Sequence, residues 1–219
     1  MKKLLACISS LLLILTACAG SGSNTTNEDA DLSPKERDAL RHVKRHLNKK
    51  EKLVDYEFVE GPMPVELMTD EYKRYRDDVY KTGLDYVNCV KRGLDEAAQD
   101  KATKLLRYQE EIIVKTHEWE QEQGTSEYLF VLATVEDTGK PDKPISKWIA
   151  VFNPVTMQRD FMFPLTTPFV NNASMILSAE NGSLFEYATD PAYNAAALAQ
   201  SLNNPILNFI FDADPSTIK

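Results

Sequence analysis

Two histidines and an aspartate near the start of the chain have the residue types and the spacing of a metal site. Asp38, His42 and His46 follow one another at intervals of four residues, so a helix would carry all three side chains on one face. Arginines at the same spacing flank this face and repel a cation, and the sequence offers no evident fourth ligand. We therefore predict no metal site and no cofactor.

A second set of residues has the types needed for catalysis but lacks the spacing. His117 and Glu118 begin a pattern used by zinc proteases, but Gln121 stands where the second histidine is required. Cys89 lies among apolar positions of an expected helix and is interpreted as a small buried hydrophobe. These residues make a binding protein a better interpretation than an enzyme.

Aromatic side chains gather in the middle of the chain, where they could line a ligand pocket. In a fold with a cone-shaped sheet, phenol hydroxyls would be the polar contacts of an otherwise aromatic site. The alternative is that the rings belong to the core and their hydroxyls reach solvent at its rim. The pocket residues that we predict are Tyr72, Tyr75, Tyr86, Tyr108, Trp148 and Phe161.

Three arginines form a basic stripe on the first expected helix. Arg37, Arg41 and Arg45 stand four residues apart, and like charges at this spacing repel one another unless an anionic group covers them. Lipid phosphates are one candidate for that group, and the acidic residues between 110 and 122 of the same chain are another. A solvated basic face is the remaining interpretation. We predict contact with an anionic surface at this stripe.

The elements that position these residues begin at a well-marked helix start. Ser33 and Glu36 have the spacing of a capping box, and Pro34 occupies the first helical position. Leu40 and Val43 begin the buried stripe of this helix.

A longer helix is expected from Thr69 to about Ala97, because tyrosines and aliphatic residues recur there at helical spacing. Gly83 and Gly93 weaken this helix, each by about 1 kcal/mol relative to alanine. We therefore expect a bend, or close packing against a sheet, at these two positions.

Alternation of apolar and polar residues predicts an antiparallel sheet. The strands are expected at residues 54–59, 111–119, 127–136, 146–152 and 157–165. The run 127–136 is apolar on both faces, so it should be a central strand. A longer loop at residues 137–144 and a tight turn at residues 153–156 join the later strands, which makes neighbouring strands antiparallel.

The composition changes after Thr166, where prolines interrupt a mostly helical segment, residues 167–219. We expect a helix from Asp190 to about Leu202 and a turn or short helix from Pro205 to Phe211. The last of these is too apolar to remain in water, so it either docks on the sheet or forms a partner surface. Docking is the preferred interpretation because soluble chains seldom expose so many apolar residues together.

The first residues of the chain have the layout of a secretory signal peptide. Lys2 and Lys3 precede an apolar run that is too short to span a membrane. Residues 1–17 are therefore expected to be removed. Their loss would change the formal net charge from −8 to −10, and a chain this acidic is not expected to bind nucleic acid.

The residues Leu15-Thr16-Ala17-Cys18 resemble the lipobox of bacterial lipoproteins. The resemblance implies that Cys18 carries a diacylglycerol, with acyl chains such as palmitate, and anchors the chain to a membrane. Ala19 stands where an inner-membrane retention signal would have aspartate, which implies the outer membrane of a Gram-negative bacterium. An ordinary signal peptide cleaved near Ala19 or Gly20 is the alternative. Residues 18–32 are small and polar, and we expect them to form a disordered tether.

The order of elements predicts an α+β fold in which N-terminal helices pack on a curved antiparallel sheet. This order over residues 33–166, with the strand Tyr56-Glu57-Phe58-Val59, resembles the cystatin-like and nuclear-transport-factor-2-like folds. In those folds a curved sheet wraps around a helix. No catalytic motif of either family accompanies the resemblance.

The functional hypothesis is a lipid-anchored protein of the cell envelope that acts as a non-catalytic binding or scaffold module. Its partner would be an unidentified protein or small molecule. One alternative is a hydrolase or isomerase with an acid and a tyrosine in the cone of the sheet. Another is an inhibitor of an envelope hydrolase, presented on loops 121–126 and 137–144.

Overall fold

The computed structural model describes residues 31–212, and these residues form an α+β fold, as predicted. From Ser33 onward the described residues belong to one compact unit. The elements are α1 (Pro34–His46), β1 (Glu51–Pro62), the 3-10 helix η2 (Val65–Met68), α2 (Thr69–Lys91), α3 (Asp95–Gln123), β2 (Glu127–Asp137), β3 (Ile145–Phe152), β4 (Arg159–Pro164), α4 (Thr167–Glu180), α5 (Leu184–Thr189), α6 (Ala195–Ser201) and α7 (Pro205–Phe211).

The start of α1 confirms the predicted capping box. The Ser33 Oγ accepts a hydrogen bond from the Glu36 backbone N–H at 3.3 Å, and the Glu36 carboxylate accepts one from the Ser33 N–H at 2.7 Å. Leu40 and Val43 are buried on the inner side of the helix, as expected. The local sequence therefore determines where this helix begins.

The sheet is a meander with the strand order β1-β2-β3-β4, and every neighbouring pair is antiparallel. The prediction that residues 127–136 form a central strand is confirmed by β2. Its side chains alternate between two cores, with Phe130 and Leu132 in one and Leu129 and Val131 in the other. A strand buried on both faces needs cover from both sides.

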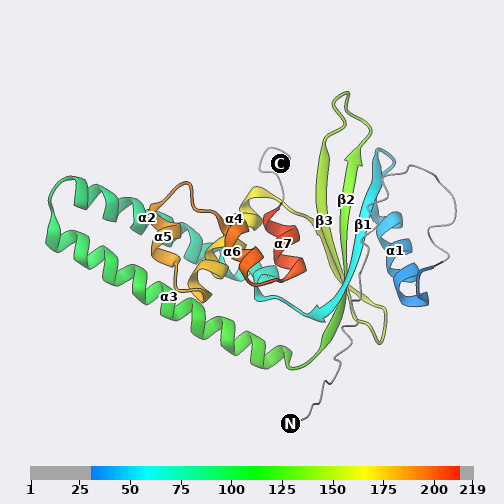
Figure 1. Cartoon of the computed structure of the whole chain (residues 1–219), viewed down its shortest axis with the longest axis horizontal. Helices are drawn as coiled ribbons and strands as arrows, with labels where there is room; N and C mark the ends of the chain where they lie inside the picture. The colour runs from blue at the N-terminus through cyan, green and yellow to red at the C-terminus, as the bar shows by residue number, and fades with distance from the viewer. Residues whose placement is uncertain (1–30, 213–219) are drawn as a thin grey trace, which may run out of the picture. The chain divides into compact units, whose positions relative to one another are not determined.

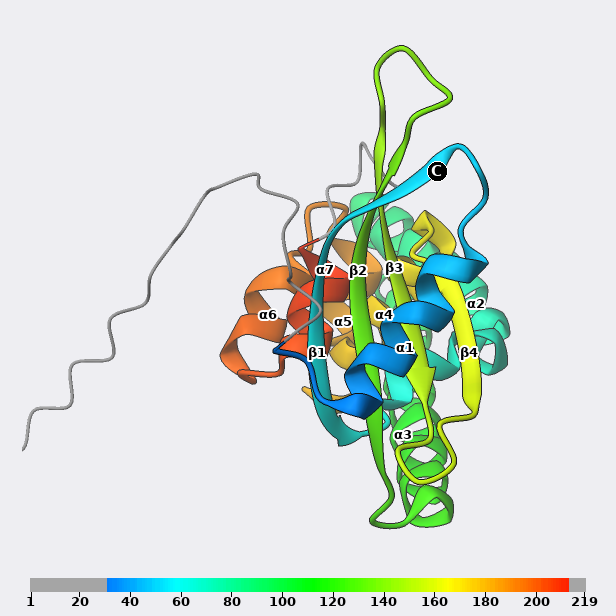
Figure 2. The ribbon, with the colours of Figure 1, turned by 90° about the vertical axis from the view of Figure 1, so that its right-hand side faces the viewer.

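Helices supply that cover on both faces of the sheet. On one face α1 lies across the strands, and its Ala39 and Val43 join the core of Val131 and Ala150 (Figure 2). On the other face lie α4, α6 and α7, with buried residues that include Leu177. The sheet is thus the middle layer between α1 and the C-terminal helices.

The two long helices, α2 and α3, form an antiparallel hairpin that packs on α4 and α5 (Figure 1). The expectation of one helix from Thr69 to Ala97 is wrong. The chain turns after Lys91, and Gly93 adopts a φ of +66°, a conformation that glycine reaches without the penalty of a side chain. Gly83 is closely packed, as expected, but against α5 and not against a sheet.

The predicted strand at residues 111–119 is wrong, because these residues lie within α3. The β-branched run there suggested a strand. The buried side chains, however, are Ile112, Thr116 and Trp119, whose spacing follows the turns of a helix. These three residues face α2 and α4, and their packing decides the conformation.

The C-terminal segment is mostly helical. The predicted helix from Asp190 begins later, at Ala195, because the Asn194 side chain caps it by accepting a hydrogen bond from the Ala197 N–H at 3.2 Å. Residues 205–211 form α7, and Ile206, Leu207, Ile210 and Phe211 are buried in the core on the sheet. In the described part of the chain, no helix is both long and apolar enough to span a membrane.

Candidate functional site

An acidic pocket of about 400 Å³ lies where the end of β1, the C-terminal ends of α3 and α4, and the start of α7 meet. Three of its lining residues are glutamates, Glu66, Glu120 and Glu180, and none is basic. The remaining lining residues are Pro62, Met63, Pro64, Val65, Trp119, Gln123, Gly124, Ser126, Leu202, Asn204 and Leu207. The pocket therefore combines apolar and amide walls with a concentration of carboxyl groups.

Glu66 is placed in the wall of the pocket by the 3-10 helix η2. Prolines at 62 and 64 end β1 and hold the chain extended, and the Leu67 N–H then donates to the Pro64 carbonyl at 3.1 Å. This tight turn directs Glu66 inward, so that only 3% of its surface is exposed. A carboxyl group this deeply buried is uncommon and requires a partner.

That partner is Glu180, whose carboxyl group lines the same pocket and interacts with the Glu66 carboxyl. Burial raises the pKa of Glu66 to about 7. Glu180 as a whole is exposed at the end of α4, but the surrounding protein partly desolvates its carboxyl group; this desolvation, and then the negative charges of Glu66 and Glu120, raise its pKa to about 8. Since two adjacent carboxylates repel, the pair is stable only when it holds a proton.

Thr116 and Tyr72 are polar residues of the helical core that lie next to the carboxyl pair of Glu66 and Glu180. The Thr116 hydroxyl lies beside both the Glu180 carboxyl and the Tyr72 hydroxyl and favours the ionised form of each. The Thr116 Oγ1 is nevertheless buried without a hydrogen-bond partner. Burial raises the pKa of Tyr72, which keeps the phenol protonated. An acid and a tyrosine therefore come close together, but among helices and not in a cone of the sheet.

The structure brings together only some of the aromatic residues predicted to line a pocket. Tyr72, Tyr75 and Tyr108 share the core between α2 and α3, with ring centroids 6.3 and 6.2 Å apart along this series. Tyr86 contacts Phe185 at 4.8 Å instead. These rings fill space between helices, and none of them lines the acidic pocket.

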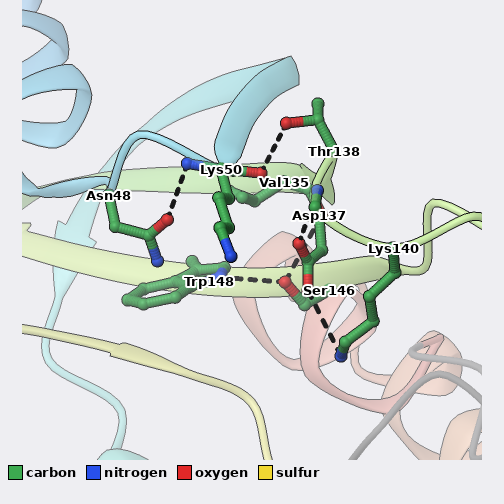
Figure 3. A network of polar contacts seen from close by, with 9 residues as sticks. Asn48, Lys50, Val135, Asp137, Thr138, Lys140, Ser146 and Trp148 are labelled. Atoms are coloured by element: carbon green, nitrogen blue, oxygen red, sulfur yellow. Dashed lines mark hydrogen bonds and ion pairs between the residues drawn. The ribbon is translucent and has the colours of Figure 1, made fainter.

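The other two predicted pocket residues lie on opposite faces of the sheet. Phe161 stacks on Phe163 at 5.6 Å beneath the C-terminal helices. Trp148 packs in the core under α1, and its indole N–H donates to the Ser146 Oγ at 3.0 Å (Figure 3). The sheet thus separates these two rings from each other.

Figure 3 also shows how loop 137–144 is held in place. The Thr138 hydroxyl donates to the Lys50 carbonyl at 2.8 Å, and Lys140 pairs with Asp137 at 3.2 Å. The other loop proposed for an inhibitor is not a meander loop, because α3 extends to Gln123. Residues 121–126 include the end of α3 and its connection to β2, and of the two segments only 137–144 is a loop of the meander.

On α1 the aspartate and the two histidines have separate contacts. Asp38 pairs with Arg41 at 2.7 Å, and the Arg159 guanidinium donates to the His46 Nδ1 at 2.7 Å. His42 lies against the Phe152 ring, with centroids 5.9 Å apart. Among the described residues, no group of three or more His, Cys, Asp or Glu side chains is placed to hold a metal ion.

The basic stripe of Arg37, Arg41 and Arg45 lies on the exposed side of α1. The acidic stretch of α3 lies on the other side of the sheet and does not cover it (Figures 1 and 2). Cys18 and the lipobox lie outside the described residues. Cys89 is a half-buried free thiol on α2.

Sequence reasoning missed Glu66 and Glu180. Glu66 stands within an apolar segment, Pro-Val-Glu-Leu-Met, and Glu180 at the end of another, Ile-Leu-Ser-Ala-Glu. An acid in such a position is a signal of a partly buried carboxyl group. The contact between them could not be predicted from the sequence, because the two residues are more than a hundred positions apart in the chain.

Comparison of the chain with protein-family models, curated proteins and solved structures gave no match.

Proposed function

We propose that the chain is a lipid-anchored protein of the cell envelope that acts as a non-catalytic binding module, taking a small organic cation into the acidic pocket. The observation that carries the proposal is the carboxyl pair in the pocket wall, in which Glu66 is buried and Glu180, at the end of α4, is exposed on its outer side. This pair retains a proton when the pocket holds no cation. A ligand ammonium group takes the place of that proton and satisfies both carboxylates at once.

The walls favour a cation with a short apolar spacer. The third carboxylate of the pocket, Glu120, belongs to α3, and the neighbouring Trp119 and Leu207 supply apolar surface. A volume of about 400 Å³ accommodates a small molecule and not a folded partner. A diamine with a few methylene groups between its nitrogens fits this distribution of charge and apolar surface.

Calorimetric titration of the full-length chain with putrescine, a four-carbon diamine, tests the proposal. Binding requires ionised carboxylates, so we expect the affinity to rise between about pH 6 and about pH 8.5 as the pair loses its proton. Proton release on binding should appear as a dependence of the heat on the buffer. Glu180→Gln should weaken binding about tenfold or more, because a charge-assisted hydrogen bond is lost.

The control is Glu118→Gln, which makes the same change of charge at an exposed position of α3 outside the pocket lining. It should leave the affinity unchanged. Equal weakening by both variants would show that only the general acidity of the protein attracts the ligand. Absence of saturable binding at about pH 8.5 would rule the proposed ligand out.

The anchor and the address in the envelope rest on the lipobox residues and on α1. α1 follows the segment that ends at Leu32, and five of its residues are basic and two acidic, which gives it a net charge of +3 with histidine neutral. A basic helix near a lipid anchor complements anionic headgroups. The resemblance to cystatin-like folds is supported by α1 lying across one face of the meander.

A hydrolase or isomerase is the second candidate, favoured by the same carboxyl pair. A carboxyl group that holds its proton near neutral pH can act as a general acid, and its ionised partner as a base. The rate of hydrolysis of nitrophenyl esters or glycosides would rise and then fall with pH, with its two limbs near the raised pKa values of the pair. The activity would disappear in Glu66→Gln. Turnover equal in wild type and Glu66→Gln would exclude the pair from catalysis.

A further inference from the structure

An apolar cleft of about 520 Å³ lies at the other end of α4, away from the acidic pocket. It is bounded by η2, the start of α2, the end of β4 and the first turns of α4. Its lining residues are Leu67, Met68, Thr69, Asp70, Glu71, Lys73, Phe163, Pro164, Thr166, Pro168, Phe169 and Asn172. The cleft has the size of a small-molecule site.

Aromatic rings form one wall of the cleft. The rings of Phe163 on β4 and Phe169 on α4 lie with centroids 4.7 Å apart and planes tilted by 49°. Leu67 and Met68 contribute aliphatic surface on the η2 side. Such walls favour a flat ring system over a flexible polar chain.

The polar end of the cleft contains an unsatisfied hydrogen-bond acceptor. Asn172 is only 1% exposed, and its side-chain Nδ2 donates to the Thr69 carbonyl at 3.1 Å. That bond fixes the orientation of the amide, yet the Asn172 Oδ1 is buried without a partner. Most buried polar atoms in folded proteins have a partner, so an acceptor left unpaired in a cleft wall is a place for a ligand donor.

The charged residues at the rim are already paired. Lys73 pairs with Asp70 in the first turns of α2, and Lys115 of α3 pairs with Glu71 at 3.1 Å. Because these charges compensate one another, the rim attracts neither a strong anion nor a strong cation. The ligand that fits is neutral.

We infer that this cleft binds a neutral, ring-bearing small molecule that donates one N–H or O–H hydrogen bond to the Asn172 Oδ1. The rings of Phe163 and Phe169 hold the apolar body of the ligand, and the donor lies at the Asn172 end. This site is separate from the acidic pocket, so neither proposal depends on the other.

Two matched probes test the inference on the full-length chain. 2-Phenylindole is neutral and fluorescent and has a single N–H, whereas 1-methyl-2-phenylindole has the same ring system without that donor. We expect saturable binding of one 2-phenylindole per chain, roughly three- to tenfold tighter than that of the methylated probe, which is the effect of one neutral hydrogen bond. Equal affinity for the two probes, or no saturable binding, would overturn the inference.

Variants then assign the two parts of the site. Asn172→Leu should abolish the preference for 2-phenylindole while both probes still bind. Phe169→Ala should weaken both probes about tenfold by removing apolar contact. Phe185→Ala, which removes a half-buried ring from α5 outside the cleft lining, should change neither affinity. Should Asn172→Leu fail to fold, the comparison of the two probes on the wild-type chain still decides the question.

Discussion

Glu66 is a carboxyl group held in an interior that opposes its charge. At 3% exposure its ionised form loses nearly all contact with water, and the adjacent Glu180 makes a second negative charge still less favourable. The fold tolerates the pair because the proton remains bound near neutral pH. The arrangement is therefore a ready source of pH dependence, whichever ligand the pocket takes.

The stability of the protein should fall as the pH rises. The folded-state pKa of Glu66, about 7, lies above its ordinary value of 4.5, so the folded state binds more protons than the unfolded state between these values. Its contribution to stability is complete below about pH 4.5 and is lost as the pH rises through 7. Urea denaturation of the full-length chain should show a loss of about 1–3 kcal/mol between about pH 5 and about pH 8 from this group. Glu180 is not included in this figure because solvent screens its exposed part.

Glu66→Gln should remove most of this pH dependence and make the protein more stable than wild type at about pH 8. A neutral amide keeps the size of the side chain and can still donate to the Glu180 carboxylate. Glu118→Gln, the exposed control, should leave the slope unchanged. Parallel pH profiles for wild type and Glu66→Gln would show that the Glu66 carboxyl is solvated in the folded protein.

At the residue scale the sequence predicted local chemistry better than long-range pairing. The bond between Ser33 and Glu36 spans three positions and follows directly from residue types. The contact of Glu66 with Glu180 depends on where η2 and the end of α4 meet, which no local pattern encodes. The sequence placed the tyrosines in a helical region, but it did not predict which side chains they contact in the core, such as Phe185.

Gly83 shows how closely two helices approach at one position. A Cβ atom added to Gly83 would lie 2.6 Å from the carbonyl carbon of Ala188 and closer still to its oxygen. The absence of a side chain therefore lets α5 rest its backbone on α2. Close approach of this kind is the reason for a glycine in the middle of a long helix.

Gly83→Ala should therefore destabilise the protein, by about 2–4 kcal/mol, although alanine has the higher helix propensity. Overlap with the Ala188 backbone outweighs the gain in propensity, since backbone atoms cannot rotate away. Thermal and urea unfolding measure the change. Asn88→Ala, at an exposed position of the same helix, is the matched control and should be neutral or slightly stabilising. A stabilised Gly83→Ala would mean that α5 can move away from α2 without loss.

At the element scale, helices with strong end signals and strands with clear alternation were predictable. The segment 111–119 was not, because Ile112, Ile113 and Val114 favour a strand by local propensity. In the structure Ile112 is fully buried while Ile113 and Val114 remain exposed, so packing on one helical face prevails over propensity. Predicting the turn at Gly93 required the same long-range information, because a glycine in a helical pattern is compatible with either a bend in the helix or its end.

On the scale of the whole molecule, the sheet separates two chemically different surfaces. The outer side of α1 is basic in a chain whose formal net charge is −8. The acidic pocket and the apolar cleft are both lined by residues of α4. Figures 1 and 2 show that α4 lies on the face of the sheet opposite α1. If α1 faces a membrane, both candidate binding sites remain directed away from the lipid and accessible to soluble ligands.

The basic stripe should therefore bind anionic membranes even without an anchor. The Cys18→Ser chain cannot be acylated at residue 18, and since it and its stripe variant both keep residues 1–17, the difference between their binding to vesicles reports the stripe. With vesicles of phosphatidylcholine and about 30% phosphatidylglycerol, we expect binding that weakens as salt rises, because the interaction is screened over about 10 Å at 0.1 M ionic strength. Adding Arg37→Gln, Arg41→Gln and Arg45→Gln should weaken binding at least tenfold, since each basic residue near such a surface contributes about 1 kcal/mol.

A matched triple variant separates position from charge. Lys91→Gln, Arg92→Gln and Arg107→Gln remove the same charge from exposed positions on the α2–α3 hairpin. If α1 is the membrane-facing element, this variant binds vesicles like the Cys18→Ser chain, because its altered residues lie on the far side of the sheet. If both triple variants lose binding equally, the net charge of the molecule governs the interaction. That outcome would leave no support for α1 as the membrane-facing helix. It would equally leave no support for the conclusion that the two pockets face away from the lipid.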